Sequence, residues 1–194
     1  MVRSNKFKKK HIIKVPQNIH VVYCNKKNII TFLGSSQTKS LKLDVEIFLI
    51  PTSNLIVVSQ NPVKGISIID FKKAKKLQGT FVAKIKQILT EINYILYQKL
   101  NLVGVGYRVF PYENLNNQIY FKLGYSHLIY FKVPDTLNTF CQKSTKLFIF
   151  GKSDINTLTQ TAAQIRVCKV PEPYKGKGIL YDQEKIVLKK GKKI

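Results

Sequence analysis

The sequence of 194 residues has little of what marks several familiar classes of protein. It contains no Trp, one Met and three Cys, and Cys24, Cys141 and Cys168 lie too far apart for a zinc-knuckle spacing or a disulfide framework. No apolar run approaches the roughly 18 residues that span a bilayer. Only Ile12 and Ile13 follow the basic N-terminus, which is too short for the apolar core of a signal peptide. These absences argue against secreted disulfide-rich, zinc-binding and membrane-spanning classes.

Acidic residues are the most telling shortage. Ten Asp and Glu stand against 33 Lys and Arg, so the formal net charge is +23 at pH 7. A compact chain with this much charge of one sign repels itself unless a polyanion neutralises it. Only three of the basic residues are Arg, and Lys acts as a point charge on phosphate rather than as a planar fork. The balance therefore predicts a nucleic-acid binder that contacts phosphates and shape more than base edges.

The basic residues gather at the two ends of the chain. Residues 1–43 hold ten Lys and Arg and no acid, and residues 143–194 hold twelve against four acids. We expect a basic N-terminal arm and a basic C-terminal tail.

Motifs for catalysis are incomplete. Gly104-Val-Gly106 begins like a dinucleotide-binding fingerprint but lacks the third glycine. Gly151-Lys152-Ser153 ends like a phosphate-binding loop, yet Lys146 stands where that loop requires glycine. His11, His20 and His127 show no metal-ligand spacing. We expect no enzyme, catalytic residue, cofactor, metal site or small-molecule substrate.

The first half predicts strands followed by one long helix. Two hairpins are expected, His20–Cys24 with Asn28–Leu33 and Val45–Ile50 with Leu55–Ser59. Apolar residues then recur every three or four positions from Phe71 to Ile95, which predicts a helix over Phe71–Tyr97. Gly79 inside that helix indicates a close packing contact.

The second half repeats this order. The predicted strands are Leu100–Phe110, Gln118–Tyr125, Leu128–Val133 and Lys146–Phe150. Gly104 and Gly106 share one face of the first, which indicates close packing. A second helix is expected to begin after Ser153 as its N-cap and to end before Pro171, and the chain beyond Pro173 is expected to be extended or mobile.

This order of elements predicts the fold class. We expect an α+β chain of two related small domains, 1–97 and 98–194, each an antiparallel or mixed sheet with a helix packed on one face.

Four strings carry a specific resemblance. They are Leu102–Arg108, Leu123–His127, Ala162–Arg166 and Pro171–Ile179. In this order and spacing they closely resemble the universal large-subunit ribosomal protein six family.

The resemblance implies a structural constituent of the ribosome that binds large-subunit rRNA near the elongation-factor-binding region, beside the sarcin–ricin loop and the stalk base. Large-subunit rRNA and neighbouring ribosomal proteins would be its partners. The rRNA-facing segment would hold Tyr174, Lys175, Gly176, Lys177 and Gly178. Charge and proximity add Arg166, Lys169 and Lys152 to the expected contacts, and Arg108 is left open between packing and contact.

Composition also bears on the compartment and on alternatives. Abundant Lys, Asn, Ile, Phe and Tyr with scarce Ala indicate an AT-biased genome, which favours an organelle-encoded protein of the mitochondrial ribosome over a plastid or bacterial one. The alternatives are a basic membrane-surface protein, for which residues 71–97 are the candidate amphipathic helix, and an RNA-modifying protein with the same basic surface.

Overall fold

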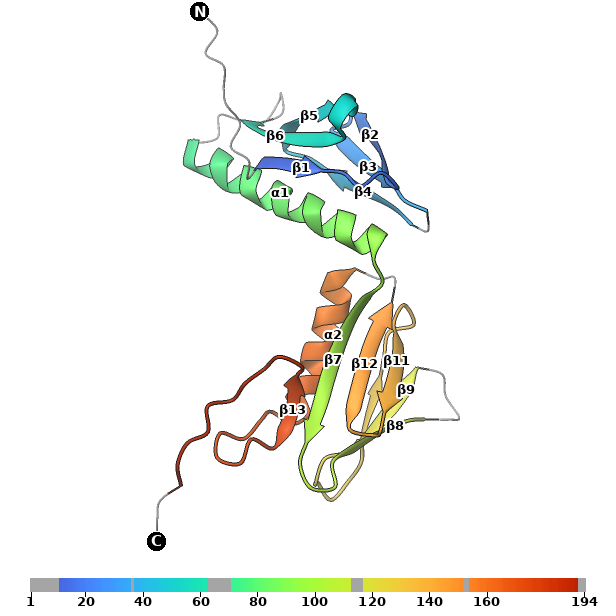
Figure 1. The fold of residues 1–194 in the computed structure, drawn as a ribbon, viewed down its shortest axis with the longest axis vertical. Helices are drawn as coiled ribbons and strands as arrows, with labels where there is room; N and C mark the ends of the chain where they lie inside the picture. Colours follow the sequence, from blue (N-terminus) through green and yellow to red (C-terminus); the bar gives the residue numbers. More distant parts are fainter. Residues whose placement is uncertain (1–10, 36, 63–70, 113–116, 152–153, 192–194) are drawn as a thin grey trace, which may run out of the picture. The chain divides into compact units, whose positions relative to one another are not determined.

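The computed structural model describes residues 11–35, 37–62, 71–112, 117–151 and 154–191. The chain divides into two compact units, Met1–Tyr94 and Ile95–Ile194, each built of antiparallel sheets and one helix (Figure 1). The predicted α+β class is confirmed. Whether 1–97 and 98–194 are the limits of independent domains stays a prediction.

Unit 1 has two three-stranded antiparallel sheets. The first has the order β2-β3-β4, with β2 at His20–Cys24, β3 at Ile29–Leu33 and β4 at Thr38–Lys42. The second has the order β1-β6-β5, with β1 at Ile12–Lys14, β5 at Val45–Ile50 and β6 at Leu55–Pro62. A single 3₁₀ turn at Pro51–Ser53 and Asn54 in the left-handed region join β5 to β6. Both predicted hairpins are confirmed.

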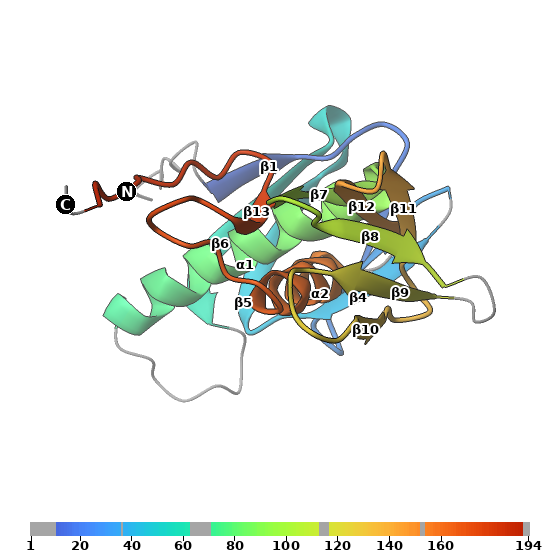
Figure 2. The same ribbon diagram turned by 90° about the horizontal axis from the view of Figure 1, so that it is seen from below.

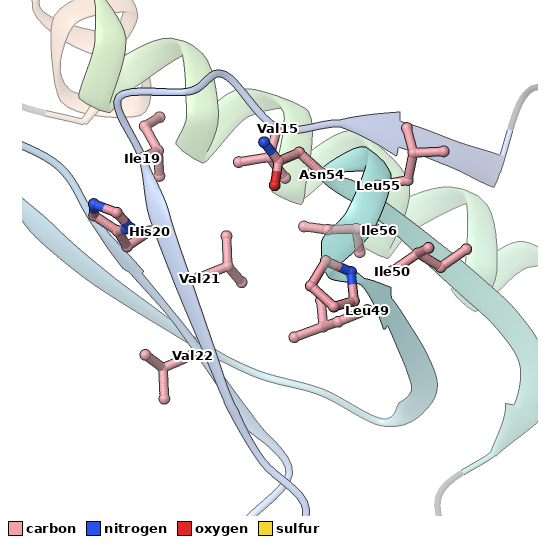
Figure 3. Close-up of a pocket in the computed structure, with 11 residues that line it drawn as sticks. Val15, Ile19, His20, Val21, Val22, Leu49, Ile50, Asn54, Leu55 and Ile56 are labelled. Carbon is pink, nitrogen blue, oxygen red and sulfur yellow. The ribbon is translucent and has the colours of Figure 1, made fainter.

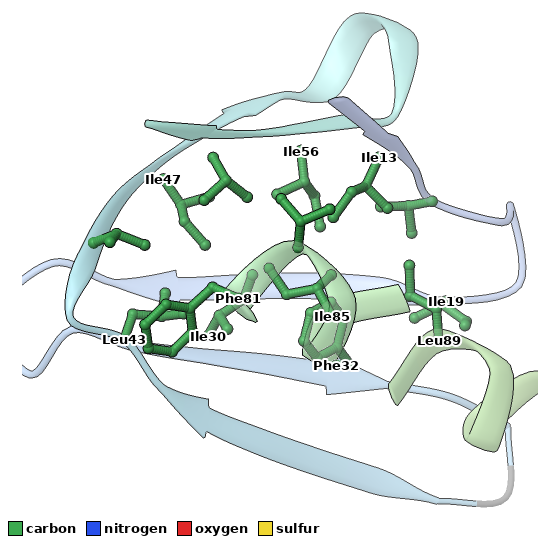
Figure 4. Close-up of a cluster of buried hydrophobic side chains, with 14 of the residues drawn as sticks. Ile13, Ile19, Ile30, Phe32, Leu43, Ile47, Ile56, Phe81, Ile85 and Leu89 are labelled. Carbon is green, nitrogen blue, oxygen red and sulfur yellow. The ribbon is translucent and has the colours of Figure 1, made fainter. Parts of the chain in front are cut away.

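Both sheets of unit 1 and its helix α1 (Phe71–Asn93) enclose one apolar core (Figure 4). Alternation along β3 turns Ile30 and Phe32 inward, and both are fully buried. The helix contributes Phe81, Ile85 and Leu89 at its three-to-four-residue spacing. The apolar stripe of the predicted helix is therefore the inner face of α1, although α1 ends at Asn93 rather than Tyr97.

Gly79 does not mark the close packing contact expected of it, because a Cβ built there meets nothing within 4 Å. Glycine in a helix interior costs roughly 0.5–1 kcal/mol relative to alanine. We therefore expect Gly79→Ala to raise the free energy of unfolding by about that amount, measured by urea denaturation. Gly34→Ala is the contrasting variant: its Cβ would overlap the side chain of Ile92, so it should destabilise the chain. A destabilised Gly79→Ala chain would contradict the open surroundings of this residue.

Unit 2 has a four-stranded and a three-stranded antiparallel sheet. The first has the order β11-β12-β7-β13, with β7 at Leu96–Val103, β11 at Asn138–Gln142, β12 at Lys146–Gly151 and β13 at Gly178–Tyr181. The second has the order β10-β9-β8, with β8 at Arg108–Pro111, β9 at Gln118–Lys122 and β10 at Ile129–Lys132. Helix α2 (Ile155–Val167) completes the unit.

The core of unit 2 is built as in unit 1. Buried side chains from both sheets, such as Leu100, Phe121 and Ile149, form one cluster with Leu158 and Ile165 of α2. The two units thus share a plan in which two antiparallel sheets and a helix bury a single cluster.

Three predictions about unit 2 are wrong. Leu100–Phe110 is not one strand, because residues 104–107 form a turn between β7 and β8. The N-cap of α2 is Asp154, not Ser153, which lies outside the described residues. The chain after Pro173 is not wholly an extended tail, because Gly178–Tyr181 is the strand β13 and pairs with β7.

Candidate nucleic-acid interface

The C-terminal segment forms a closed loop that backbone hydrogen bonds hold. The Ile179 N–H donates to the Lys169 carbonyl (2.9 Å) and closes the base of the loop. Within it, the Glu172 N–H donates to the Lys177 carbonyl (3.0 Å) and the Gly176 N–H to the Glu172 carbonyl (2.9 Å). Since β13 begins at Gly178, this loop, which we call the basic loop (residues 169–178), is anchored at the edge of the four-stranded sheet.

Two glycines permit this shape. Gly176 has φ +68°, a left-handed conformation that favours glycine. Gly178 has φ +157°, and a Cβ there would lie 2.6 Å from the Pro171 Cα and 3.0 Å from the Lys169 carbonyl oxygen. The loop therefore crosses its own backbone at Gly178, where no side chain fits.

The basic loop leaves its charged and aromatic side chains accessible. Tyr174 is 54% exposed, Lys175 is exposed and Lys177 is half-buried. A shallow depression of about 470 Å³ opens beside the loop. Its lining residues come from the loop, the end of α2 and two turns of the sheets: Tyr107, Tyr125, Val167, Lys169, Val170, Glu172 and Lys177.

Tyr125 organises this depression. Its hydroxyl donates a hydrogen bond to the Cys168 carbonyl (3.2 Å), and its ring stacks on His127 with centroids 5.9 Å apart. The Lys169 Nζ lies 4.0 Å from the centroid of the same ring, within the range of a cation–π contact. The depression therefore combines lysine ammonium groups, which can contact phosphate, with aromatic rings. Glu172 is the one carboxylate among its described lining residues.

The turn between β7 and β8 supports the site through its glycines. A Cβ on Gly104 would lie 2.6 Å from the Tyr107 ring, and one on Gly124 would lie 3.1 Å from it. The absence of a side chain at Gly104 therefore makes room for the Tyr107 ring, which agrees with the packing role predicted for this glycine. Gly106 has open space around it, so glycine is required there by the left-handed φ of +73° and not by packing. Both lie in a turn rather than on the strand face from which packing was predicted.

Arg166 is engaged within the protein. Its Nε and Nη2 donate to the two carboxylate oxygens of Glu184 at 3.1 and 2.5 Å, and its guanidinium lies 5.6 Å from the centroid of the Tyr181 ring. The Tyr181 N–H also donates to Glu184 (3.2 Å). The hydrogen bonds from Arg166 hold the pKa of Glu184 below its ordinary value. This ion pair joins α2 to the chain after β13.

The lowered pKa of Glu184 predicts a pH dependence of strand β13. A carboxylate with a lowered pKa in the folded state contributes stability above its ordinary pKa of 4.5 and loses it as the pH falls through the lowered value. Because the pair is partly exposed, we expect protection of the β13 amides from hydrogen exchange to fall about fivefold below pH 4.5, the equivalent of ~1 kcal/mol. Glu184→Gln should show the reduced protection at every pH, whereas Glu172→Gln should keep the acid transition. Equal profiles for the unchanged chain and Glu184→Gln would contradict the role of the pair.

The structure brings most of the predicted site residues together. Tyr174, Lys175, Gly176, Lys177 and Gly178 lie in the basic loop, with Lys169 at its base. Arg166 lies on α2 with its side chain turned to Glu184, and Lys152 lies outside the described residues.

Sequence reasoning assigned no site role to Tyr107, Tyr125 or His127. Tyr107 and Tyr125 line the depression, and His127 stacks on Tyr125. All three lie in the strings Leu102–Arg108 and Leu123–His127, so the sequence did mark them as part of the resemblance. The sequence around them does not show that these turns contact the basic loop.

A second depression, of about 400 Å³, lies in unit 1 (Figure 3). Apolar side chains such as Val21, Leu49 and Ile56 line it, and His20 is the one titratable residue among its described lining. It offers no ammonium or guanidinium for a phosphate, so the basic loop is the better candidate.

Across the described ranges, no three His, Cys, Asp or Glu gather as metal ligands would. Neither described helix is long and apolar enough to cross a membrane.

The sequence is also similar to those of known proteins. The family model described as ribosomal protein L6 matches residues 103–182, which include the basic loop. The chain is 35% identical to the large ribosomal subunit protein uL6 of Mycoplasmoides gallisepticum over 93% of each chain. It is 33% identical to the mitochondrial protein uL6m of Prototheca wickerhamii over 94% of this chain and 95% of that one. Identity to uL6 of Chlorobium phaeobacteroides is 37% over 73% of this chain and 77% of the relative.

Proposed function

Because this chain belongs to the ribosomal protein L6 family, we propose that it binds folded rRNA of the large ribosomal subunit through the basic loop. Proteins of this family are structural and not enzymes, and the role of this chain in the ribosome is structural. The mechanism is neutralisation of closely spaced phosphates, with release of their counterions.

The observation that carries the proposal is the way the basic loop is held. Its backbone closes at Ile179 and cannot accept a side chain at Gly178, so Lys175 and Lys177 are presented from an ordered scaffold. An ordered loop loses less conformational entropy on binding than an extended tail does. Lys169 and the Tyr125 ring beside it extend the same surface.

The resemblance of the four strings supports a place near the elongation-factor-binding region, beside the sarcin–ricin loop and the stalk base, with neighbouring ribosomal proteins as further partners. Lys152 and Arg166 belong to this proposed contact by charge and proximity. For Arg166 to contact rRNA, its guanidinium would have to reach a phosphate while it holds Glu184.

We infer the mitochondrion as the compartment. The AT-biased composition and the similarity to a mitochondrial relative support it, and similarity to bacterial relatives makes a bacterial ribosome the alternative. Fractionation of the source cells distinguishes the two.

The membrane-surface alternative required an amphipathic helix with a free apolar face. Helix α1 was the candidate, but Phe81, Ile85 and Leu89 on that face are buried in the core of unit 1. A vesicle-flotation assay tests this alternative. The RNA-modifying alternative needs a methyl-donor or nucleophile pocket, and calorimetry with a methyl donor tests it.

The experiment that tests the proposal is sedimentation of a lysate through sucrose gradients across a salt series. We expect the chain to migrate with the large subunit after a low-salt wash, and to dissociate as salt rises because phosphate contacts are screened. Recovery in the soluble or membrane fraction at low salt would overturn the proposal.

A further inference from the structure

The outer face of the three-stranded sheet in unit 2 carries aromatic rings where solvent-facing positions are usually polar. Strands β8, β9 and β10 lie side by side (Figure 2). Alternation turns Val109, Ile119 and Phe121 into the core, all fully buried. The positions that alternate with them face outward.

These outward positions form a row of rings across the sheet. In the strand register Phe110 stands opposite Tyr120, and Tyr120 opposite Tyr130. The ring centroids of Phe110 and Tyr120 are 5.3 Å apart, and those of Tyr120 and Tyr130 are 6.2 Å apart. Tyr112 meets Tyr120 and Tyr130 edge-on, at 6.5 and 6.0 Å. Tyr130, at the end of the row, is 59% exposed.

Positive charge flanks the rings on the same face. Arg108 and Lys122 stand opposite each other two residues from Phe110 and Tyr120, and Lys132 is two residues from Tyr130. All three side chains are exposed, and none forms an ion pair with a carboxylate in the part of the chain that the structure describes. The three strands contain no Asp or Glu. The face is therefore both aromatic and uniformly cationic.

The outer face of the four-stranded sheet makes a useful contrast. Phe140 and Phe148 also pair there, with centroids 6.4 Å apart. However, the neighbouring cation, Lys99, is paired with Asp182 at 2.6 Å. Lys146 is exposed on the same face, two residues from Phe148, and Asp182 interacts electrostatically with it as well. A carboxylate therefore offsets positive charge on that face, whereas β8, β9 and β10 carry none.

We propose that the outer face of β8, β9 and β10, which we call the ring face (Arg108, Phe110, Tyr112, Tyr120, Lys122, Tyr130 and Lys132), binds single-stranded RNA by stacking unpaired bases on its rings. Aromatic side chains displayed across a sheet can stack two or three bases, and flanking cations contact the phosphates between them. Four rings flanked by three cations have this composition. Arg108, which sequence reasoning left open between packing and contact, is assigned to contact.

The inference goes beyond the proposed function. The basic loop holds folded rRNA through phosphates, whereas the ring face requires unpaired bases. The two surfaces lie on different elements of unit 2 and can be altered separately.

The test uses the purified full chain and a fluorescent ten-nucleotide oligouridine, with binding followed by fluorescence anisotropy. Since stacking contributes strongly for each base, Tyr120→Leu with Tyr130→Leu should raise the Kd about tenfold or more. Tyr120→Phe with Tyr130→Phe keeps both rings and should change the Kd less than about threefold. The matched control is Tyr94→Leu with Tyr97→Leu, which removes two exposed tyrosines elsewhere in the chain and should leave the Kd unchanged.

Two further measurements keep the outcome decisive. Circular dichroism melting checks that the leucine variant is folded. If the variant is unfolded, ultraviolet cross-linking of the unchanged chain to the oligouridine takes the place of the binding comparison. Cross-links are then expected on Tyr120 or Tyr130. Repeating the comparison in a Lys175→Glu, Lys177→Glu chain separates the ring face from the basic loop, so that each proposal fails by itself.

The proposal is overturned if the folded leucine variant binds oligouridine as tightly as the unchanged chain, or if cross-links fall only in residues 169–178. A leucine variant that keeps the oligonucleotide but dissociates from the subunit would also overturn it, and would identify the ring face as a protein contact.

Discussion

Replacing Lys175 and Lys177 together with Glu is expected to release the chain from the large ribosomal subunit at moderate salt. Both lysines lie in the basic loop away from the two cores, so the variant should fold normally. Hydrogen bonds to charged groups contribute roughly 1.5–3 kcal/mol each, so the removal of two predicts at least about a hundredfold weaker association. The slope of log K against log salt should also become shallower by about two, one for each phosphate that is no longer neutralised. Sedimentation with purified subunits measures both quantities.

The matched control is Lys26→Glu with Lys27→Glu. These two exposed lysines lie in the turn between β2 and β3 of unit 1, and the variant has the same net charge. We expect it to stay with the subunit over a wider range of salt. Equal weakening in both variants would show that total charge, rather than the basic loop, determines binding.

Gly178→Ala is expected to weaken the same association without removing any charge. The new Cβ would lie 2.6 Å from the Pro171 Cα and 3.0 Å from the Lys169 carbonyl oxygen, both of them backbone atoms of the loop. Gly178 has φ +157°, and backbone strain at such an angle costs a residue with a side chain about 1–3 kcal/mol. The overlap of the new Cβ with these two atoms adds to this cost. The loop should open at its base, which frees the Ile179 N–H from the Lys169 carbonyl. Hydrogen exchange at Ile179 and sedimentation with subunits should therefore change together.

Gly191→Ala is the control for this variant, because a Cβ at Gly191 meets nothing within 4 Å. It should change neither measurement. A Gly178→Ala chain that binds normally while the Ile179 amide exchanges rapidly would show that the closed shape of the loop is not needed for binding.

Much of the fold could be predicted because its signals are local. Short apolar runs on either side of the polar stretch Asn25–Lys27 identified β2 and β3, and the recurrence of apolar residues through Phe81 and Ile85 identified α1. These patterns show which face of a single helix or strand is buried, and they can be read from residues that are close together in the sequence.

The rest depended on contacts between distant residues. Val103, Val105, Tyr107 and Val109 alternate with other residues as they would in a continuous strand. The turn that includes Gly106, at φ +73°, was therefore missed. Strand β13 has four residues and pairs with β7, which is far away in the chain, so no local pattern revealed it. For the same reason the strings identified the basic loop, but not the contact of Lys169 with Tyr125.

The pairing of β13 with β7 also determines the order in which the two units can fold while the chain is being synthesised. Gly178 is about 75 residues beyond Val103, its partner. At about 5–20 residues per second, β7 waits about 4–15 s for that neighbour, and its edge offers unpaired backbone groups meanwhile. Unit 1 precedes this interval and can bury its core without any later residue. The basic loop closes only when Ile179 is in place, so a nascent chain cannot acquire the shape proposed to bind rRNA before that residue has been added.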